Sequence, residues 1–240
     1  MLNMSAVHKS RGAGSQRYSL VIPRLQLRAG EQLAVVGPSG CGKSTLLDLL
    51  ALVLAPDQAG QFDFAPGQTR TDITGLWRAD AQSALADLRS RHLGYVLQTG
   101  GLLDFLDVRG NIDLSRKLLG LKDDGSVDRL AGALDIADQL GKRPGDLSVG
   151  QRQRVSCARA LAHGPRLLLA DEPTAALDPL NAERVMQLLV TQAREHGVCC
   201  VVATHDESLA RASGLQVRRI SCHRDVDGGV TATLGEAADA

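Results

Sequence analysis

Apolar residues along the chain fall into short runs, which are separated by longer amphipathic stretches. The runs at residues 19–27, 32–36 and 93–97 have the length of strands. Two further runs, at residues 167–170 and 198–203, are apolar at every position. Runs of this kind are typical of strands that are buried on both faces of a parallel sheet.

The amphipathic stretches predict helices at residues 43–54, 81–91 and 180–196. A longer, mostly helical stretch spans residues 102–162 and is interrupted by glycine-containing breaks. Because strands alternate with helices, we expect an α/β fold with a parallel sheet. The long middle stretch would be a helical subdomain inserted into that fold.

Three other segments predict strands outside the parallel core. Residues 2–8 are expected to form a short strand, and residues 60–64 an edge strand. Residues 216–234 alternate in character around Asp227-Gly228-Gly229, which fits a hairpin. The sheet is therefore expected to carry an antiparallel edge.

The composition narrows the classes of function. Lys plus Arg equals Asp plus Glu, at 27 each, so the formal net charge is zero and no broad basic surface for nucleic acid is expected. Aromatic residues make up only 2%, which argues against base stacking. No apolar run reaches the ~20 residues of a membrane helix, and the N-terminus lacks the apolar core of a signal peptide. We expect a cytoplasmic protein that can still dock on a membrane partner.

The cysteines do not suggest a disulfide framework. Their number is odd and none of their spacings is CxxC, so we interpret them as reduced thiols of a cytosolic protein. They are Cys41, Cys157, Cys199, Cys200 and Cys222.

The segment GPSGCGKS, residues 37–44, matches the phosphate-binding pattern G-x-x-x-x-G-K-[ST]. It lies between an apolar strand and a predicted helix, as the pattern requires. Backbone N–H groups of such a loop, with the N-terminus of the following helix, form a nest for anions. Lys43 would add a charge for the outer phosphates, and the Ser44 hydroxyl suits Mg²⁺. The residues expected to surround the phosphates are Gly37, Pro38, Ser39, Gly40, Cys41, Gly42, Lys43 and Ser44.

Polar side chains follow three other predicted strands at their carboxyl ends, where ligands of parallel sheets bind. Asp171 is placed to hold Mg²⁺, and Glu172 to orient or deprotonate an attacking water. His205 can hydrogen-bond a γ-phosphate or that water, and Gln98 can offer its amide to Mg²⁺ or water. Taken alone, the acid pair could be an ordinary helix N-terminal charge, and the histidine could be structural.

The segment LSVGQ, residues 147–151, precedes another helical run. Ser148 would cap that helix, and the helix N-terminus with the Gly150 N–H would make a second anion site. One nucleotide does not need two such sites in one chain. Two head-to-tail copies would resolve this, since each would cap the ATP of the other. In isolation, a plain N-cap is the alternative.

Taken together, these motifs resemble the nucleotide-binding domain of ATP-binding cassette (ABC) proteins. In order they are GPSGCGKST, Gln98, LSVGQRQRVSCARAL, LLLADEPTAALD and His205. The resemblance covers essentially the whole chain and implies one domain, residues 1–240. It implies a RecA-like P-loop core at about 1–97 and 164–240, and an inserted α-helical signature subdomain at about 98–163. It also implies ATP and Mg²⁺ as ligands, and a homodimer that sandwiches two ATP molecules.

The resemblance assigns roles to matching residues. Those implied for the nucleotide site are phosphate and Mg²⁺ binding for Lys43, Ser44 and Thr45, the Walker B acid for Asp171, the catalytic carboxylate for Glu172 and the switch histidine for His205. Those implied for coupling are the Q-loop residue for Gln98, the signature acting in trans for Ser148, Gly150 and Gln151, and the D-loop aspartate for Asp178.

Three positions depart from the family pattern. Val149 replaces the usual signature glycine, and because the expected contacts use Ser148 and Gly150, we expect activity to be retained. Ala175 replaces a common serine in the D-loop. The aromatic residue that usually stacks on adenine is replaced by Arg11, whose guanidinium plane can also stack. Tyr18 is the other candidate for contact with adenine. Alternatively, it is an ordinary half-buried residue of a strand.

The segment LGYVLQTGGLLDFLDVRGNI, residues 93–112, resembles the branch that includes lipoprotein-release and macrolide-efflux ATPases, although Asp104, Asp107 and Gly110 depart from it. The resemblance implies a separate integral membrane permease, docked near residues 98–105, with the chain peripheral on the inner face of the membrane. The work would be export, lipoprotein release or mechanical signalling. An ABC importer subunit, or a soluble non-transport ABC ATPase, remains the alternative.

Overall fold

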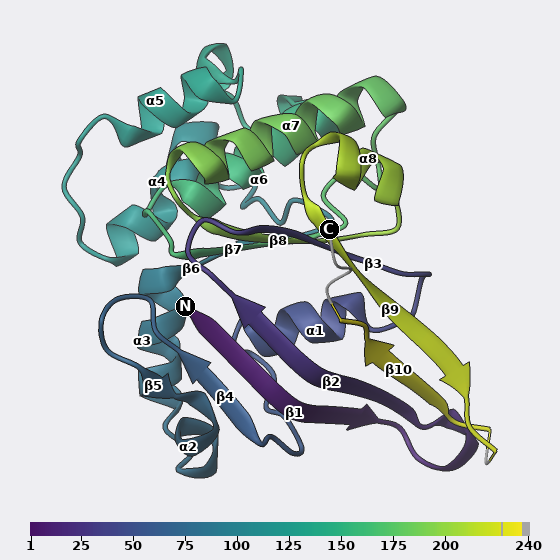
Figure 1. Ribbon diagram of the computed structural model, residues 1–240. Coiled ribbons are helices and arrows are strands. Elements are labelled where there is room, and N and C mark those ends of the chain that lie inside the picture. Colours follow the sequence, from purple (N-terminus) through teal and green to yellow (C-terminus); the bar gives the residue numbers. More distant parts are fainter. Residues whose placement is uncertain (227, 237–240) are drawn as a thin grey trace.

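In a computed structural model, which describes residues 1–226 and 228–236, the chain forms a mixed sheet with helices against it (Figure 1). The described strands run in the order β5-β4-β1-β2-β10-β9-β3-β8-β7-β6. The strands are β1 Leu2–Arg11, β2 Tyr18–Leu27, β3 Gln32–Val36, β4 Gln61–Phe64, β5 Thr71–Asp72, β6 Leu93–Val96, β7 Leu167–Asp171, β8 Cys199–Thr204, β9 Gln216–Arg224 and β10 Val230–Leu234. The α-helices are α1 Lys43–Leu50, α2 Ile73–Arg78, α3 Gln82–His92, α4 Val108–Leu118, α5 Ser126–Ala133, α6 Val149–Leu161, α7 Pro179–Glu195 and α8 Glu207–Ala212.

The sheet has a parallel half and a largely antiparallel half. β3 pairs in parallel with β8 and β9, and β7 pairs in parallel with β8 and β6. β1 pairs antiparallel with β2 and β4, and β9 pairs antiparallel with β10. The parallel core and the antiparallel flank predicted from the sequence are therefore confirmed. The predicted hairpin is β9–β10, although Asp227 in its turn lies outside the described residues.

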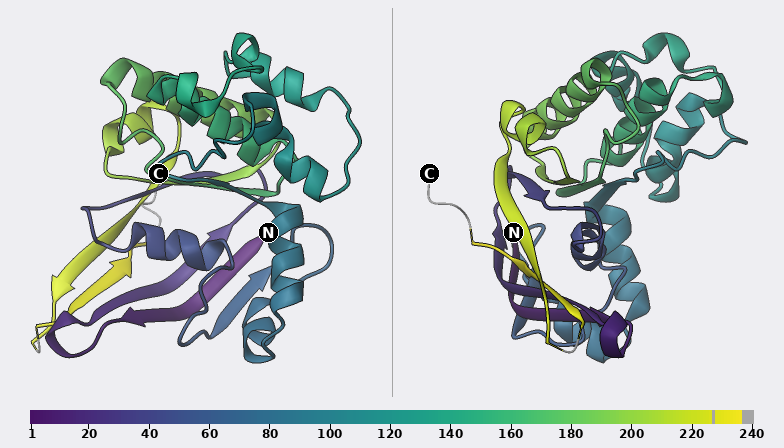
Figure 2. Two further views of the ribbon diagram at one scale, coloured as in Figure 1. Left: turned by 180° about the vertical axis from the view of Figure 1, so that it is seen from behind. Right: turned by 90° about the vertical axis from the view of Figure 1, so that its right-hand side faces the viewer.

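Helix α1 lies between the two halves of the sheet, which curl around it, and the views of Figures 1 and 2 agree on this. Helices α6 and α7 cover the other face of the parallel strands, with α4 and α5 beyond them. The ends of β3, β7 and β8 therefore meet the N-terminus of α1 on one side of the molecule.

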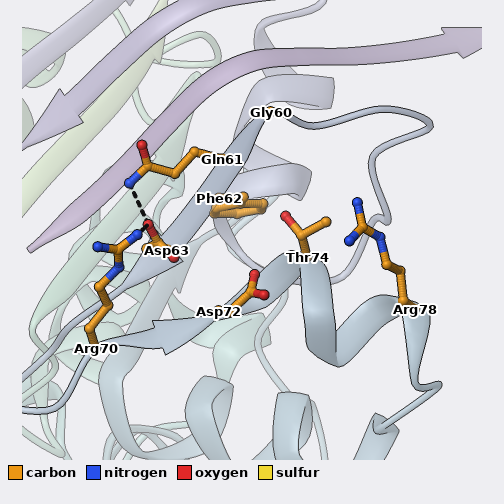
Figure 3. A pocket seen from close by; sticks show the side chains of 8 residues that line it. All are labelled: Gly60, Gln61, Phe62, Asp63, Arg70, Asp72, Thr74 and Arg78. Carbon is orange, nitrogen blue, oxygen red and sulfur yellow. Dashed lines mark hydrogen bonds and ion pairs between the residues drawn. The ribbon is translucent and has the colours of Figure 1, made fainter.

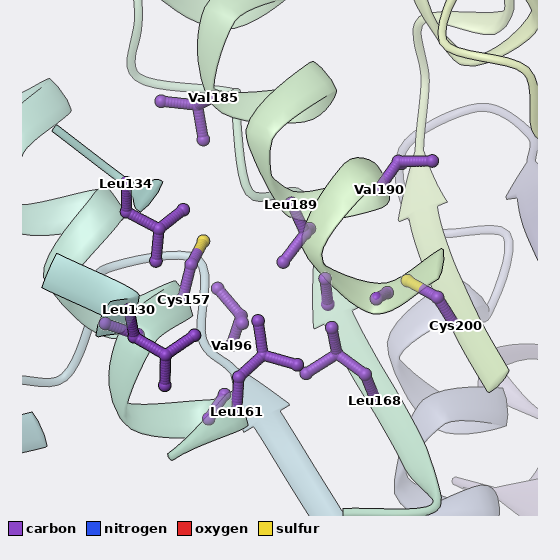
Figure 4. Packing of buried hydrophobic residues seen from close by; sticks show 14 of the residues in the cluster. Val96, Leu130, Leu134, Cys157, Leu161, Leu168, Val185, Leu189, Val190 and Cys200 are labelled. Atoms are coloured by element: carbon purple, nitrogen blue, oxygen red, sulfur yellow. The ribbon is translucent and has the colours of Figure 1, made fainter. Parts of the chain in front are cut away.

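Two hydrophobic clusters hold these layers together. In the first, Leu168 of β7 and Cys200 of β8 face Leu189 of α7 and Leu161 of α6 (Figure 4). The alternate residues of the same strands, such as Leu169, belong to the second cluster with α1 and the antiparallel strands. β7 and β8 are thus buried on both faces, as their unbroken apolar runs predict.

The helical middle of the chain contains α4, α5 and α6. Helix α6 approaches the sheet closely at Gly94 of β6, where an added Cβ atom would lie 2.2 Å from the carbonyl oxygen of Ala160. The C-terminal part of α6 therefore packs directly on the parallel core.

Some of the helix and strand assignments predicted from the sequence are wrong in detail. Helix α1 ends at Leu50 instead of residue 54, because Leu52 adopts a left-handed φ of 58° that stops the helix. β4 is not the edge strand, since Asp63 pairs with Asp72 of the short strand β5 outside it. Helices α2 and α8 were not predicted; each has an aspartate N-cap, Asp72 or Asp206.

Candidate functional site

The phosphate-binding pattern lies in the loop that joins β3 to α1. Gly40 and Gly42 adopt φ values of 78° and 91°, in the left-handed region that side chains disfavour. An added Cβ atom at Gly42 would lie 1.7 Å from the Tyr18 hydroxyl oxygen, so only glycine fits there. The loop turns its backbone toward the N-terminus of α1, which begins at Lys43. The geometry is that of an anion nest.

The Lys43 ammonium group is enclosed by this loop. Its Nζ atom donates to the carbonyl oxygens of Gly37 at 2.9 Å and Pro38 at 3.2 Å. It also lies 3.1 Å from Oε1 of Glu172, and only 6% of the Lys43 side chain is exposed. A buried cation beside loop N–H groups provides a strong positive potential at this end of the sheet.

Asp171 ends β7 beside the start of α1. Burial raises the pKa of its carboxyl group, while a hydrogen bond from the Ser44 hydroxyl opposes that rise. Its Oδ1 atom is buried and has no hydrogen-bond partner among the described residues. A buried carboxylate oxygen with a free lone pair, beside a hydroxyl oxygen, fits one face of a Mg²⁺ coordination shell.

No group of three or more His, Cys, Asp and Glu side chains is placed to hold a metal ion anywhere in the part of the chain that the structure describes. Mg²⁺ is usually bound by one or two carboxylates with water and substrate phosphates.

Glu172 and His205 form a hydrogen-bonded pair. His205 Nδ1 lies 2.8 Å from Oε2 of Glu172, and the glutamate side chain is mostly buried. Glu172 has a left-handed φ of 45°, and its N–H donates to the carbonyl oxygen of Ala203. Non-glycine residues in this region of φ carry strain, which the fold must hold in place. The contacts of the carboxylate with His205 and Lys43 hold its direction.

A cleft of about 630 Å³ joins the phosphate loop to Glu172 and His205, whereas Asp171 is not among its lining residues. Most of the side chains predicted to act on nucleotide line it, together with Ala175. Its lining residues are Tyr18, Ser39, Gly40, Gly42, Lys43, Ser44, Thr45, Gln98, Glu172, Ala175 and His205.

The two candidates for an adenine contact are neighbours on adjacent strands, since Arg11 of β1 pairs with Tyr18 of β2. The Tyr18 hydroxyl donates to the carbonyl oxygen of Cys41 at 2.8 Å, so this side chain also supports the loop. Arg11 lies 3.5 Å from Asp48 of α1 and does not line the cleft.

The signature residues lie on a different surface of the same chain. Ser148 Oγ accepts from the N–H of Gln151 at 3.2 Å, and the Gln151 side chain accepts from the N–H of Ser148, which confirms the predicted cap. None of Ser148, Gly150 and Gln151 lines the cleft. Gly150 packs near Asn181, whose side chain donates to Asp178 at 2.6 Å. The signature and the Asp178 cap of α7 therefore form one surface.

A second cavity, of about 330 Å³, lies at the outer edge of the antiparallel half (Figure 3). The buried carboxylate of Asp63 accepts there from Gln61 and pairs with Arg70, both at 2.5 Å. No residue predicted to act on nucleotide lines this cavity.

Residues 22–175 match the family described as ABC transporter. The chain belongs to the ABC transporter family. It is 39% identical over 189 residues to the lipoprotein-releasing system ATP-binding protein LolD of Paramagnetospirillum magneticum, covering 78% of this chain and 80% of that protein. It is equally similar, at 39% over 189 residues, to the macrolide export ATP-binding/permease protein MacB of Wolinella succinogenes, of which it spans only 28%. The branch predicted from residues 93–112 is thereby confirmed.

Solved cassettes have the same fold. The dimeric bacterial ABC transporter cassette MJ0796 superposes with a TM-score of 0.78 at 29% identity, covering 96% of each chain. A second structure of that cassette, in a dimeric post-hydrolysis state bound to ADP and Pi, gives a TM-score of 0.76 at 30% identity. The present chain is accordingly an ATP-binding cassette that hydrolyses ATP. Across its described residues, none of its helices is long and apolar enough to cross a membrane.

Proposed function

We propose that this cassette is the motor subunit of a membrane complex of the lipoprotein-release or macrolide-export type. Two copies close head-to-tail over two ATP molecules, and closure and reopening move a separate permease on the inner face of the membrane. The observation that carries this proposal is the separation of Ser148, Gly150 and Gln151 from the cleft of their own chain. The similarity to LolD supports the choice of partner.

The contacts of Lys43 suggest how binding of the ATP phosphates prepares Glu172 for hydrolysis. Lys43 now pairs with Glu172, and the phosphates of ATP would compete for that ammonium group. Once released from Lys43, Glu172 keeps its hydrogen bond to His205 and can accept a proton from an attacking water. Lys43 and the loop N–H groups then stabilise charge on the γ-phosphate oxygens.

The residues that would hold Mg²⁺ are Ser44, Asp171 and Gln98. When bound, this ion neutralises phosphate charge. Burial raises the pKa of Asp171 and leaves its Oδ1 atom without a partner among the described residues, and an added cation would relieve both. The Ser44 hydroxyl donates a hydrogen bond to the other oxygen of that carboxylate.

The signature residues of the partner copy, Ser148, Gly150 and Gln151, would complete each nucleotide site. The N-terminus of α6 directs N–H groups outward, and Ser148 caps it. Asp178 and Asn181 adjoin that surface and would link the two copies. Arg11 and Tyr18, which are paired across β1 and β2, are the proposed neighbours of the adenine ring.

Mixing two inactive variants tests the composite site. Lys43→Ala removes the phosphate ligand from one copy, and Ser148→Arg blocks the signature of the other. A mixed dimer has one intact composite site, so we expect measurable ATPase activity from the mixture and little from either variant alone. If the mixture stays as inactive as its components over a range of ratios, the trans arrangement is wrong.

The membrane partner is tested separately by co-purification with candidate permeases. We expect a stable complex with a four-span permease that carries a large periplasmic domain, and ATPase activity that changes on complex formation. Binding only to a six-span permease with a solute-binding protein would instead identify an importer.

A further inference from the structure

Cys41 in the phosphate loop lies beside β9, the strand that carries Cys222, although the two cysteines are far apart in the sequence. The Cys41 thiol is one cause of the raised pKa of Cys222. Cys41 is 2% exposed and packs in the second hydrophobic cluster, whereas Cys222 reaches the surface. The pair therefore joins a buried thiol of the nucleotide site to one that small solutes can reach.

The register of the sheet fixes this placement. Cys222 pairs with Ala232 of β10, which pairs in turn with Leu20 of β2. Directly paired residues point to the same face of a sheet. Leu20 and Ala232 are fully buried in the cluster that contains Cys41, so Cys222 also projects toward the loop.

β9 also encloses the beginning of the loop. An added Cβ atom at Gly37 would lie 2.5 Å from Sγ of Cys41 and 3.0 Å from the carbonyl oxygen of Ile220. Gly37 is thus confined between the Cys41 side chain and the backbone of β9. The position of the Cys41 thiol cannot change without moving the loop.

The other cysteines have no such access. Cys157, Cys199 and Cys200 are buried within the two hydrophobic clusters, and burial raises the pKa of each thiol. Thiols of this kind are inert toward oxidants in solution. Among the cysteines, oxidation would therefore begin at Cys222.

We propose that Cys41 and Cys222 form a reversible disulfide that ties the phosphate loop to β9 and suppresses ATP binding. The oxidant is a hydroperoxide. The Cys222 thiolate attacks one peroxide oxygen, the O–O bond breaks, and a sulfenic acid and water result after proton transfer. The Cys41 thiolate then attacks the sulfenic sulfur and displaces water, so two thiols and one hydrogen peroxide give one disulfide and two waters. A dithiol reductant returns both electrons and restores the thiols.

Closure of this bond must distort the loop. Bonded sulfur atoms are about 2 Å apart, which is well inside the contact distance of two thiols. The Cys41 carbonyl oxygen, held by the Tyr18 hydroxyl, and the left-handed turns at Gly40 and Gly42 are adjacent to the atom that moves. Phosphate recognition depends on how the loop N–H groups converge, so the affinity for ATP falls.

The environment of Cys222 also affects how fast its thiol reacts. Burial raises the pKa of its thiol, and the neighbouring Cys41 adds to the rise, while Lys43 opposes it. A raised pKa lowers the fraction of thiolate and so slows the reaction of Cys222 with peroxide.

The experiment uses the full chain, reduced and then treated with hydrogen peroxide. We expect a mass-spectrometric cross-link between the peptides of Cys41 and Cys222, and at least a tenfold loss of ATP affinity that dithiothreitol reverses. The matched control is Cys222→Ser, which lies outside the binding machinery. It should bind ATP like the reduced wild type before and after peroxide.

Three results would overturn the proposal. The first is no Cys41–Cys222 cross-link at any peroxide dose that leaves the fold intact. The second is cross-linked protein that binds ATP as well as reduced protein. The third is an equal loss of affinity in Cys222→Ser, which would assign the effect to another group. Circular dichroism after treatment separates each of these from unfolding.

Discussion

Nδ1 of His205 lies 2.8 Å from Oε2 of Glu172, while Oε1 of the same carboxylate lies 3.1 Å from Nζ of Lys43. One carboxylate therefore connects the group proposed to bind phosphate with the group proposed to sense it. Glu172 is held between them by a strained backbone with φ of 45°. Changes at this carboxylate should separate binding from hydrolysis.

Glu172→Gln should lower the ATPase rate about a hundredfold or more, the usual contribution of a general base. ATP affinity should be unchanged or tighter, because Lys43 loses the anion that competes with phosphate for it. Steady-state phosphate release and equilibrium nucleotide binding measure the two effects. Glu183→Gln, on the exposed face of α7, is the matched control. An unimpaired rate in Glu172→Gln would remove Glu172 from the proposed mechanism.

Asp171→Asn should raise the melting temperature of the nucleotide-free protein at neutral pH. Burial raises the pKa of Asp171 in the folded state, so the folded protein is most stable with this proton bound. That stability is lost as pH rises from the unfolded value of about 3.9 through the folded pKa. The advantage of asparagine should therefore vanish near pH 3 and grow toward neutral pH.

The same variant should lose the dependence of ATP binding on Mg²⁺. Melting curves across pH, with and without Mg²⁺ and ATP, test both effects, and Asp104→Asn at an exposed position serves as control. A variant that is less stable than wild type at every pH would show that the hydrogen bond from Ser44 outweighs the cost of the buried charge.

The bounds of β3, and those of β7 and β8 to within one residue, could be predicted from the sequence, as could the residues at their carboxyl ends. Their apolar runs are continuous, and β7 and β8 are followed by the polar residues Glu172 and His205, which have no place in a core. β3 leads directly into the glycine-rich phosphate loop. Parallel packing then brings Asp171 and His205 to one edge of the sheet. Local pattern and a general rule of sheet geometry were sufficient for this part of the site.

Other features depend on contacts that no local pattern encodes. The early end of α1 follows from the left-handed conformation of Leu52, a residue that ordinarily favours continuing a helix. The placement of Cys222 near the phosphate loop depends on the pairing of β2 with the hairpin β9–β10, which is distant from it in sequence. The cysteines were therefore interpreted only as reduced thiols, and their proximity could not be predicted.

Gly94→Ala tests the packing of α6 on the sheet. The new Cβ atom would lie 2.2 Å from the carbonyl oxygen of Ala160, which is backbone and cannot rotate away. We expect a loss of about 1–3 kcal/mol in the free energy of unfolding. Gly132→Ala in α5 is the matched control, since its Cβ atom meets nothing within 4 Å. It should gain about 0.5–1 kcal/mol. Urea unfolding of both variants measures the difference, and equal stability would contradict the close approach.

Tyr18→Phe separates support of the phosphate loop from contact with adenine. The variant keeps the ring but loses the hydrogen bond to the Cys41 carbonyl oxygen, which is worth about 1 kcal/mol. If the hydroxyl holds the loop, affinity for ATP and for inorganic triphosphate should fall together, by about fivefold for that energy. Tyr18→Leu also removes the ring, so an additional loss confined to ATP would measure stacking on the base. Arg11→Ala provides the comparison at the neighbouring position. Should Tyr18→Phe bind both ligands as wild type does, the hydroxyl contributes nothing to the loop, and the Tyr18 ring alone would remain as a candidate for nucleotide recognition.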